Sequence, residues 1–459
     1  MSNINLPATS TLGITTKPQA IFTKAIKRRL TCWLFLLLIP LMASVVQAQE
    51  DLWTGIGPVG GRISKLAVDS GTATTLYAGT FDSGVLKSID GGASWHGVNN
   101  GLTSTDILSL ALDPTNANTL YTGTNDHGLF KSTDGGESWT SIRVGLPSGF
   151  LVTSIVIDPT SPLTIYAGII GGCDFFCDGS VFKSVNGGQS WNATILTRGI
   201  TALAMDPRNP TTVYAAAESN LYKTVDGGLS WSEQGDITQG FPFPDITTIA
   251  IDPISPSRLY VGSVGLVLTP SQNWIRKGIF KSNDGGTIFN EATAGLTDFN
   301  IEDLVIDPGT PATLYAATDS GVFRSGNRGK NWSELNNGLG NVFVSDLAII
   351  PTDPPTLYAA TFGSGVFVVQ PVGPFPPATL RITNAFVFKK KLWVFGEMFD
   401  PGAKLLLNGE LQHTRNDVHN PLATLFAKKA GNKITPGQTV TLQVRNPDGT
   451  LSQEFRFTR

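Results

Sequence analysis

Charge, cysteine and histidine are all scarce in this sequence. Only 15% of the 459 residues are Asp, Glu, Lys or Arg, and the chain has 3 cysteines and 4 histidines. A charged fraction this low, beside 50 Gly and 28 Pro, argues against a helical or a disordered protein and favours many short strands joined by tight turns. The length allows two or three domains with a large buried core.

The first 48 residues have the composition of an export signal. A basic start at residues 24–29 precedes an apolar run at residues 30–46, which Pro40 interrupts. Small residues ending in Ala48 complete a cleavage site, so the mature chain would begin at Gln49. The run is short for a membrane span, although an uncleaved signal anchor stays open. We therefore predict an exported protein, located in the periplasm, at the cell surface or outside the cell.

Two cysteines remain once that segment is removed. Cys173 and Cys177 have three residues between them, and in an exported protein such a pair is expected to close a small loop as a disulfide. A metal site would need further ligands, and no histidine lies nearby. We predict a disulfide, no metal and no cofactor.

Charge is unevenly distributed along the chain. Residues 49–373 hold 16 Lys and Arg against 30 Asp and Glu, whereas residues 374–459 hold 12 against 6. The acidic body argues against nucleic acid as a partner, because phosphate backbones require clustered cations. The basic tail favours association with the anionic cell envelope, unless it is simply a solvated strand face.

An eight-residue motif recurs six times at spacings of 40 to 58 residues. The copies are SIDGGASW (88–95), STDGGESW (132–139), SVNGGQSW (184–191), TVDGGLSW (224–231), SNDGGTIF (282–289) and SGNRGKNW (325–332). Self-similarity of this period indicates a repeat architecture.

Other pieces recur upstream of each copy. One is an apolar run ending in Asp-Pro, such as LALDP (110–114), and another is a strand with a tyrosine, such as LYTGT (120–124). Seven of the eight tyrosines occupy this position: Tyr77, Tyr121, Tyr166, Tyr214, Tyr260, Tyr315 and Tyr358. With a G-V/L-F-K-S piece and a strand that starts at the Trp, each unit predicts the four strands of a propeller blade.

The strand count closes the ring. Strands one to three occur seven times, but the fourth strand occurs only six times inside the repeats, and residues 52–55 (LWTG) at the mature N-terminus resemble the missing one. Placing them in the seventh blade leaves no open sheet edge. We predict an all-β chain with a signal peptide (1–48), a seven-bladed β-propeller (49–370), a Pro-rich linker (371–377) and a small immunoglobulin-like β-sandwich (378–459).

The motif predicts the hairpin turn between strands three and four. Its Asp or Asn and its Ser or Thr can accept backbone N–H groups, its Gly allows positive φ, and its Trp offers a large apolar face. It resembles the Asp-box, or bacterial neuraminidase repeat, of sialidases, xyloglucanases, sortilin-type receptors and the photosystem II assembly factor. In those families the motif lies at the blade periphery, away from the ligand. The resemblance implies a structural role for Asp90, Asp134, Asn186, Asp226, Asp284 and Asn327.

The resemblance does not fix an activity. A sialidase needs an arginine cluster and a Tyr nucleophile paired with Glu, whereas the arginines here are scattered and the tyrosines are repeat residues. Xyloglucanases couple two propellers around a cleft, and this chain predicts one. The photosystem II assembly factor is similar in length and blade number, but its basic patch is not evident in an acidic body, and the C-terminal domain is an addition.

The C-terminal part resembles another family. Its turn segments GEMFDPGA (396–403) and RNPDG (445–449) resemble the IPT/TIG type of immunoglobulin-like domain. Five or more short strands over this length suit a small sandwich. The resemblance implies a spacer or an adhesion module.

Two insertions interrupt the repeat, at residues 168–180 in blade three and 262–278 in blade five. Both fall between strands two and three, so they are expected on one face, which in repeat proteins commonly marks the binding side. Exposed aromatic rings beside polar groups suit sugar rings or peptide side chains. The candidate binding residues are Asp174, Phe175, Phe176, Trp274, Arg276, Phe241 and Phe243. The alternative is that the single phenylalanines plug the central channel or pack between blades.

Carboxylates near the start of strand three offer a catalytic alternative. Asp126 and Asp178 could act as general acid and base on a glycoside, although Asp followed by Gly or Ser-Gly is also an ordinary turn former, which we favour. The leading hypothesis is a monomeric binding or scaffold protein, without catalysis, that recognises a protein or a glycan on the insertion-bearing face. The alternative is a glycoside hydrolase acting on a polysaccharide, xyloglucanase-like rather than sialidase-like.

Overall fold

The structure is a computed structural model that describes residues 51–459 except 126, 174–176, 218, 236–244, 265, 269–273, 277, 372–379, 398, 401, 417–423 and 448. The predicted signal segment therefore lies outside the described residues. Within the described part, no helix combines the length and the apolarity that a bilayer crossing requires.

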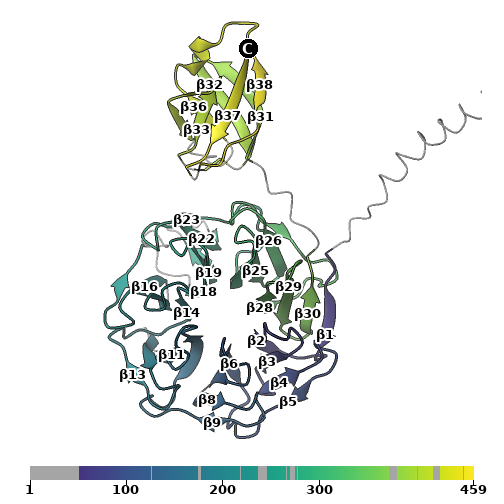
Figure 1. Ribbon diagram of the computed structural model, residues 1–459, viewed down its shortest axis with the longest axis vertical. Coiled ribbons are helices and arrows are strands. Elements are labelled where there is room, and N and C mark those ends of the chain that lie inside the picture. Colours follow the sequence, from purple (N-terminus) through teal and green to yellow (C-terminus); the bar gives the residue numbers. More distant parts are fainter. Residues whose placement is uncertain are drawn as a thin grey trace, which may run out of the picture. The chain divides into compact units, whose positions relative to one another are not determined.

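Seven four-stranded antiparallel sheets succeed one another, and Figure 1 shows them as blades around a common centre. The first three blades are β2 (Ile63–Val68), β3 (Leu76–Thr80), β4 (Val85–Ser88) and β5 (His96–Gly97); β6 (Ile107–Leu112), β7 (Leu120–Thr124), β8 (Gly128–Ser132) and β9 (Thr140–Ser141); and β10 (Leu151–Ile157), β11 (Ile165–Cys173), β12 (Cys177–Ser184) and β13 (Asn192–Ala193). The next three are β14 (Ala202–Met205), β15 (Val213–Ala217), β16 (Asn220–Thr224) and β17 (Ser232–Glu233); β18 (Asp245–Ile251), β19 (Leu259–Val264), β22 (Ile279–Ser282) and β23 (Asn290–Glu291); and β24 (Ile301–Ile306), β25 (Leu314–Thr318), β26 (Gly321–Ser325) and β27 (Ser333–Glu334).

The seventh blade joins the two ends of the ring. It consists of β28 (Val344–Ile350), β29 (Thr356–Thr361), β30 (Gly365–Val369) and, as its outermost strand, β1 (Thr54–Gly57). In Figure 1 the purple β1 lies beside the green β30. Just before β1, the buried Trp53 donates its indole N–H to the carbonyl of Leu335 in blade six at 2.6 Å. The fold is the seven-bladed β-propeller expected from the repeats.

Small residues let neighbouring blades approach closely. The second strand of most blades is buried at every position, as in LYAGT of β3. A Cβ placed on Gly79 in this strand would lie 2.5 Å from the Ile107 side chain of the next blade. Large side chains are therefore excluded from these positions, because the sheets pack at interior density.

Each turn that carries the repeated motif is held by its own side chains, and the first copy is the example. Ser88 donates to Asp90 at 2.7 Å, and its hydroxyl accepts the N–H of Gly92 at 2.8 Å. Asp90 also accepts the N–H of Ser94 at 2.9 Å and the Ser94 hydroxyl at 2.6 Å. These bonds lower the pKa of Asp90 to about 2, with the hydroxyl of Ser94 as the main cause. The carboxylate therefore organises the turn on which it stands.

The repeated Tyr and Lys reach the turn of the following blade. Tyr166 and Lys183 both donate to the carbonyl of Gly227, at 3.0 and 2.8 Å, and the ammonium lies 5.2 Å from the centroid of the ring. The same arrangement recurs for Tyr121 with Lys131, Tyr214 with Lys223 and Tyr260 with Lys281. These residues join blade to blade, which explains their repetition.

The two insertions are β-hairpins rather than plain loops. In blade three, β11 and β12 extend until Cys173 stands opposite Cys177 in the register. In blade five, β20 (Leu266–Leu268) pairs with β21 (Trp274–Arg276). The cysteine side chains lie outside the described part of the structure, so the disulfide stays a prediction.

The C-terminal part forms two further four-stranded sheets. One has the order β31 (Arg381–Phe388), β32 (Lys391–Glu397), β36 (Thr424–Ala427) and β35 (Thr414–Asn416). The other has the order β34 (Glu410–Leu411), β33 (Lys404–Leu407), β37 (Thr439–Arg445) and β38 (Phe455–Thr458), and a 3₁₀ turn, η1 (Ala430–Lys433), follows β36. Buried side chains from both sheets share one core that includes Leu392, Val394, Leu405 and Leu442. The assignment to the IPT/TIG type stays a prediction.

Candidate functional site at the centre of the propeller

A bulge marks the innermost strand of six blades. The pairing of β2 with β3 shifts between Ile63 and Lys65, and equivalent shifts occur in β6, β10, β18, β24 and β28. The bulged residues are Ser64, Leu108, Thr153, Thr247, Glu302 and Ser345. A bulge re-aims the side chain that it carries, so these residues share one special position near the centre of the ring.

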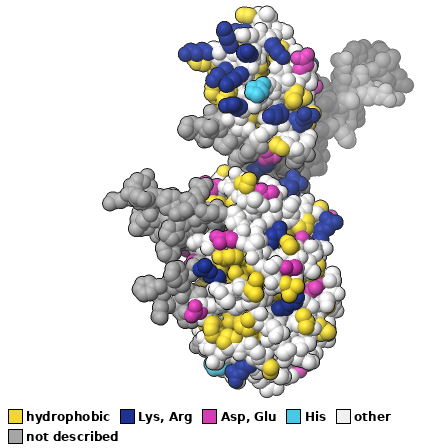
Figure 2. Space-filling view, turned by 90° about the vertical axis from the view of Figure 1, so that its left-hand side faces the viewer, with side chains coloured by type: hydrophobic (Ala, Val, Ile, Leu, Met, Phe, Trp, Pro, Cys, Tyr) yellow, Lys and Arg dark blue, Asp and Glu magenta, His cyan; other side chains and the backbone are white. Residues whose placement is uncertain are grey.

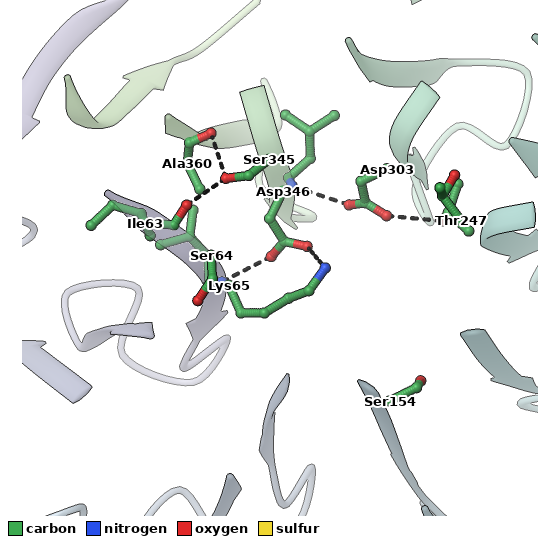
Figure 3. Close-up of polar contacts among 12 residues, drawn as sticks. Ile63, Ser64, Lys65, Ser154, Thr247, Asp303, Ser345, Asp346 and Ala360 are labelled. Atoms are coloured by element: carbon green, nitrogen blue, oxygen red, sulfur yellow. Dashed lines mark hydrogen bonds and ion pairs between the residues drawn. The ribbon is translucent and has the colours of Figure 1, made fainter. Parts of the chain in front are cut away.

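At four of the six bulged positions a hydroxyl group ties the blade to the next. Ser64 donates to the carbonyl of Ile107 at 2.6 Å. Figure 3 shows the equivalent bond at the ring closure, from Ser345 to the carbonyl of Ile63 at 2.6 Å. Glu302 occupies the same position in blade six. An ionised carboxylate cannot donate a hydrogen bond, so Glu302 departs from the inter-blade pattern.

The next residue along the strand carries charge in three consecutive blades. Lys65 of blade one forms an ion pair with Asp346 of blade seven at 2.8 Å, and Asp346 also accepts the N–H of Leu66 at 2.8 Å (Figure 3). Asp303 of blade six accepts the N–H of Leu347 at 3.0 Å and the hydroxyl of Thr248 at 2.9 Å. Both carboxylates thus bridge neighbouring blades. Their four oxygens are occupied by these donors.

Two carboxylates and one ammonium leave this network with excess negative charge. Burial alone would lower the pKa of Lys65, but the carboxylates of Asp346 and Asp303 raise it overall, so the lysine stays charged. Burial, with a further contribution from Asp303, raises the pKa of Asp346 to about 6. The network accepts a proton near neutral pH more readily than an exposed aspartate would.

Glu302 has the most perturbed carboxyl group described near the centre. Burial is the main cause that raises its pKa to about 7, and the negative charges of Asp319 and Asp298 add to the effect. A carboxyl group with a pKa near 7 can be present in both protonation states at neutral pH. Such a group can exchange a proton with a ligand.

An aromatic and cationic cluster lies where blades seven and one meet. It stands at the loop end of the ring, the end that carries the connections between the second and third strands of each blade. The guanidinium of Arg62 lies 4.2 Å from the centroid of Phe362 and 5.6 Å from that of Phe81. The Phe362 ring contacts Phe81 edge-on at 5.4 Å and Phe343 at 5.7 Å. Phe362 is 44% exposed, and Arg62 is exposed as well. We call these four residues the Arg62 cluster.

The backbone fixes the Arg62 cluster. Arg62 and Phe362 form an antiparallel bridge. The N–H of Phe81 donates to the carbonyl of Arg62 at 3.2 Å, and the N–H of Phe362 donates to the carbonyl of Phe343 at 3.0 Å. The rings offer apolar area beside the guanidinium. The backbone therefore holds an exposed cation and exposed ring area together at this place.

Most predicted binding residues lie beyond what the structure describes. Asp174, Phe175, Phe176, Phe241, Phe243 and the catalytic candidate Asp126 are outside the described residues, and for Trp274 and Arg276 only the backbone is described, in β21. Asp178 is described and exposed, at the start of the extended β12. The roles of these residues in ligand binding and of Asp126 and Asp178 in catalysis therefore stay predictions.

Sequence reasoning missed the Arg62 cluster and the central charges. Arg62, Phe81 and Phe362 stand at strand ends, where the repeat does not draw attention to them. Alignment of the seven innermost strands could have found the charges, because Lys65, Glu302, Asp303 and Asp346 replace hydroxyl or small residues of other blades. Phe150 and Phe299, by contrast, pack against the blade cores, as in the alternative interpretation of single phenylalanines. Among the described residues, no group of three or more His, Cys, Asp or Glu is arranged to hold a metal ion.

Comparison with known proteins supports the fold. No family model and no curated protein matches the chain. Among solved structures, an ancestral GH74 enzyme aligns with a TM-score of 0.57 and 16% identity over 88% of this chain and 63% of its own. The GH74 xyloglucanase from Xanthomonas campestris aligns with a TM-score of 0.54 and 14% identity, covering 88% of this chain and 75% of its own. YCF48 bound to D1 peptide aligns with a TM-score of 0.48 and 15% identity, covering 71% of this chain and 98% of its own. The chain thus spans less than two thirds of the first enzyme, and the likeness shows the propeller fold alone.

Proposed function

We propose that this chain is an exported, non-enzymatic binding protein that captures a polysaccharide on the loop end of its propeller. The Arg62 cluster carries the proposal, because it combines exposed ring area with a cation oriented over the rings. Sugar rings bind through apolar faces and hydroxyl groups, which such a site satisfies with Phe362 and with the N–H groups of Arg62. The predicted Trp274 and Phe175 hairpins would extend the same surface.

The central carboxylates support binding rather than hydrolysis. A glycosidase needs two carboxyl groups that face the substrate. Asp303 and Asp346 instead accept backbone, hydroxyl and ammonium donors from adjacent blades. The Asp-box carboxylates, exemplified by Asp90, are likewise engaged in their own turns, and we propose a structural role for all six motif residues.

Binding can be tested with polysaccharides as probes. Mature protein would be titrated with xyloglucan, since that is the substrate named for one structural neighbour, and with a panel of other plant and bacterial polysaccharides. We expect the double variant Arg62→Gln with Phe362→Ala to bind at least tenfold more weakly. An aromatic ring that becomes buried under the ligand usually contributes much of the binding free energy. The matched control is Leu229→Ala, which removes a side chain that is 78% exposed on an Asp-box turn.

Two results would contradict the proposal. Equal loss of affinity in Leu229→Ala would mean that binding does not depend on the Arg62 cluster. A melting temperature that falls only in the double variant would mean that the cluster serves packing.

A glycoside hydrolase is the second candidate, because two of the similar structures with TM-scores above 0.5 are GH74 enzymes. The raised pKa of Glu302, about 7, is that of a general acid at neutral pH. If the chain is a hydrolase, released reducing sugar should appear with xyloglucan and disappear in Glu302→Gln, whereas binding should persist. Turnover that survives Glu302→Gln but is lost in Asp178→Asn would assign the acid to Asp178 instead.

A further inference from the structure

The C-terminal domain carries an aromatic row across one of its sheets. On the sheet β31-β32-β36-β35, the residues Ile382, Leu392, Val394 and Leu425 point into the shared core. Because side chains alternate along a strand, the residues between them stand on the opposite, outer face. Phe386, Trp393, Phe426 and Arg415 are consecutive register partners there, one from each strand.

The rings of this outer face form one continuous surface. Phe386 lies 6.3 Å from Trp393 and 5.5 Å from Phe395, with ring planes inclined by only 16° and 22°. Trp393 in turn lies 5.2 Å from Phe426. Phe386 is 43% exposed and the neighbouring Phe388 is 57% exposed. With strands about 4.8 Å apart, the row extends roughly 14 Å across the sheet.

Cations surround the row. The ammonium of Lys391 lies 4.9 Å from the centroid of Phe426 and 5.8 Å from that of Trp393, and the ammonium of Lys389 lies 5.4 Å from that of Phe388. Arg415 ends the row on β35. Over residues 378–459 the sequence has 12 Lys and Arg against 6 Asp and Glu. Figure 2 shows dark blue Lys and Arg side chains gathered on the surface of this domain.

Two of these lysines occupy an unfavourable turn. Lys389 and Lys390 join β31 to β32 with φ of 44° and 69°. Such two-residue hairpin turns favour Asn-Gly, because a side chain at positive φ costs free energy. The turn therefore places two cations beside the aromatic row at the expense of stability, which is typical of functional positions.

The other sheet of the same domain provides a contrast. Its outer face carries Lys404, Leu406, Thr441 and Gln443 between core residues, the exposed Leu411 pairs with Leu406, and Thr439 bonds to Thr458. This face mixes aliphatic and polar side chains, and its described strands place no aromatic ring on it. The aromatic row is therefore a property of one sheet and not of the domain in general.

We propose that the aromatic row and its lysines form a binding site for an acidic polysaccharide, a chain of uronate sugars. The rings supply apolar surface for sugar rings, and Lys389, Lys390, Lys391 and Arg415 supply charge for the carboxylates. A neutral glycan would leave the cations uncompensated.

The geometry favours a polymer over a membrane. Insertion into a bilayer requires apolar side chains that protrude well beyond the surrounding surface. Trp393, Phe395 and Phe426 are instead only partly exposed, and Trp393 and Phe426 lie level with one another across the sheet. A flat row with a cationic border matches an extended anionic chain that lies on the surface.

The test uses the complete mature chain and polygalacturonate as the probe, in a salt titration. We expect affinity to fall as salt rises, and binding to methyl-esterified polygalacturonate to be at least tenfold weaker. The variant Phe386→Ala should weaken binding about tenfold, since its ring is exposed and its loss leaves the core intact. Lys404→Gln on the opposite sheet is the matched control and should bind normally.

The most discriminating variant replaces Lys389 and Lys390 by Asn and Gly. It should raise the melting temperature, because Asn-Gly suits the turn, and at the same time weaken binding to polygalacturonate severalfold. A merely structural turn would give the stabilisation without the loss of affinity, which would overturn the proposal. Equal binding of anionic lipid vesicles and polygalacturonate, or unchanged binding in Phe386→Ala, would also overturn it. Because these variants leave the Arg62 cluster untouched, the result is independent of the proposed function of the propeller.

Discussion

The turn side and the centre of the propeller are built from the same repeat but use it differently. At the turns, Asp90 and its counterparts bond inside their own hairpins, and Tyr and Lys of the preceding blade complete the contact. At the centre, the repeat supplies hydroxyl groups in most blades, but three consecutive blades carry charges instead. The residues that recur therefore assemble the ring through the turns, and the charged residues that depart from the repeat add ion-pair and hydrogen-bond contacts between blades at the centre.

The seam of the ring illustrates how the repeat is adjusted. The described outer strand of blade seven is the N-terminal β1, so blade six does not meet a motif turn there. Arg324 stands in blade six where blades one to five have Lys, and it pairs with Asp51 at 3.6 Å. The guanidinium reaches the N-terminal segment, so the substitution follows from the way the ring closes.

The largest effect is expected where the repeat joins two blades. Trp139 is buried, and its indole N–H donates to the carbonyl of Val98 at 2.7 Å. Trp139→Ala should lower the free energy of unfolding by about 3–5 kcal/mol, as measured by chemical denaturation. Trp139→Phe should cost about 1–2 kcal/mol for the lost hydrogen bond.

Trp231 offers the matched control for that bond. Its indole N–H is buried without a hydrogen-bond partner among the described residues. Trp231→Phe should therefore cost less than Trp139→Phe. A larger cost at Trp231 would show that the indole hydrogen bonds do not join the blades.

A smaller effect, of opposite sign, is expected at the centre. Because the folded-state pKa of Glu302 is raised to about 7, the folded protein binds more protons than the unfolded chain between about pH 4.5 and 7. Stability from this group is present at low pH and is lost as pH rises through 7. Glu302→Gln should thus increase the free energy of unfolding at pH 8 by about 1–2 kcal/mol, less than the full shift implies because the side chain is only partly buried.

The pH dependence provides the check on Glu302. Thermal melts of both proteins would be compared from pH 5 to 8. The two curves should approach one another as the pH falls towards 4.5 and be furthest apart at pH 8. Parallel curves would show that Glu302 does not titrate in this interval.

The smallest effect is expected at the Asp-box carboxylates. Hydrogen bonds, first from Ser138, lower the pKa of Asp134 to about 2, so its contribution to stability is present above pH 4 and is lost as pH falls towards 2. Asn186 occupies the same place in blade three and accepts the equivalent N–H. Asp134→Asn should therefore leave the melting temperature at pH 7 nearly unchanged and flatten its fall between pH 4 and 2. A large loss of stability at pH 7 would contradict a purely local role.

The sequence predicts the ring well because its determinants are local and repeated. The turn motif, the Tyr position and the Trp53 strand each have a period that can be read without coordinates. The Arg62 cluster could not be read in this way, since Arg62, Phe81 and Phe362 are brought together by ring closure between blades one and seven. The two insertions could be located in the sequence. That they form the hairpins β11–β12 and β20–β21 could not, because this depends on hydrogen bonding between strands.

The C-terminal row was hidden for a related reason. The alternation of side chains in β31 and β32 predicts strands with one face on the core and one face outward. It does not predict that aromatic residues of three strands are register partners on the outward face. Phe386 and Trp393 face each other across the hairpin of β31 and β32, but Phe426 lies far along the chain, and only the strand order places it beside them.

The central claim is that ligand binds at the departures from the repeat and not at the repeated turns. Hydrogen exchange of the mature protein, with and without the best-binding polysaccharide of the panel, measures this directly. We predict slower exchange at residues 61–63, 81–84, 343–345 and 361–365, which carry the Arg62 cluster, and unchanged exchange at the Asp-box turns. Protection confined to the turns, for example at residues 90–95 and 134–139, would contradict the account.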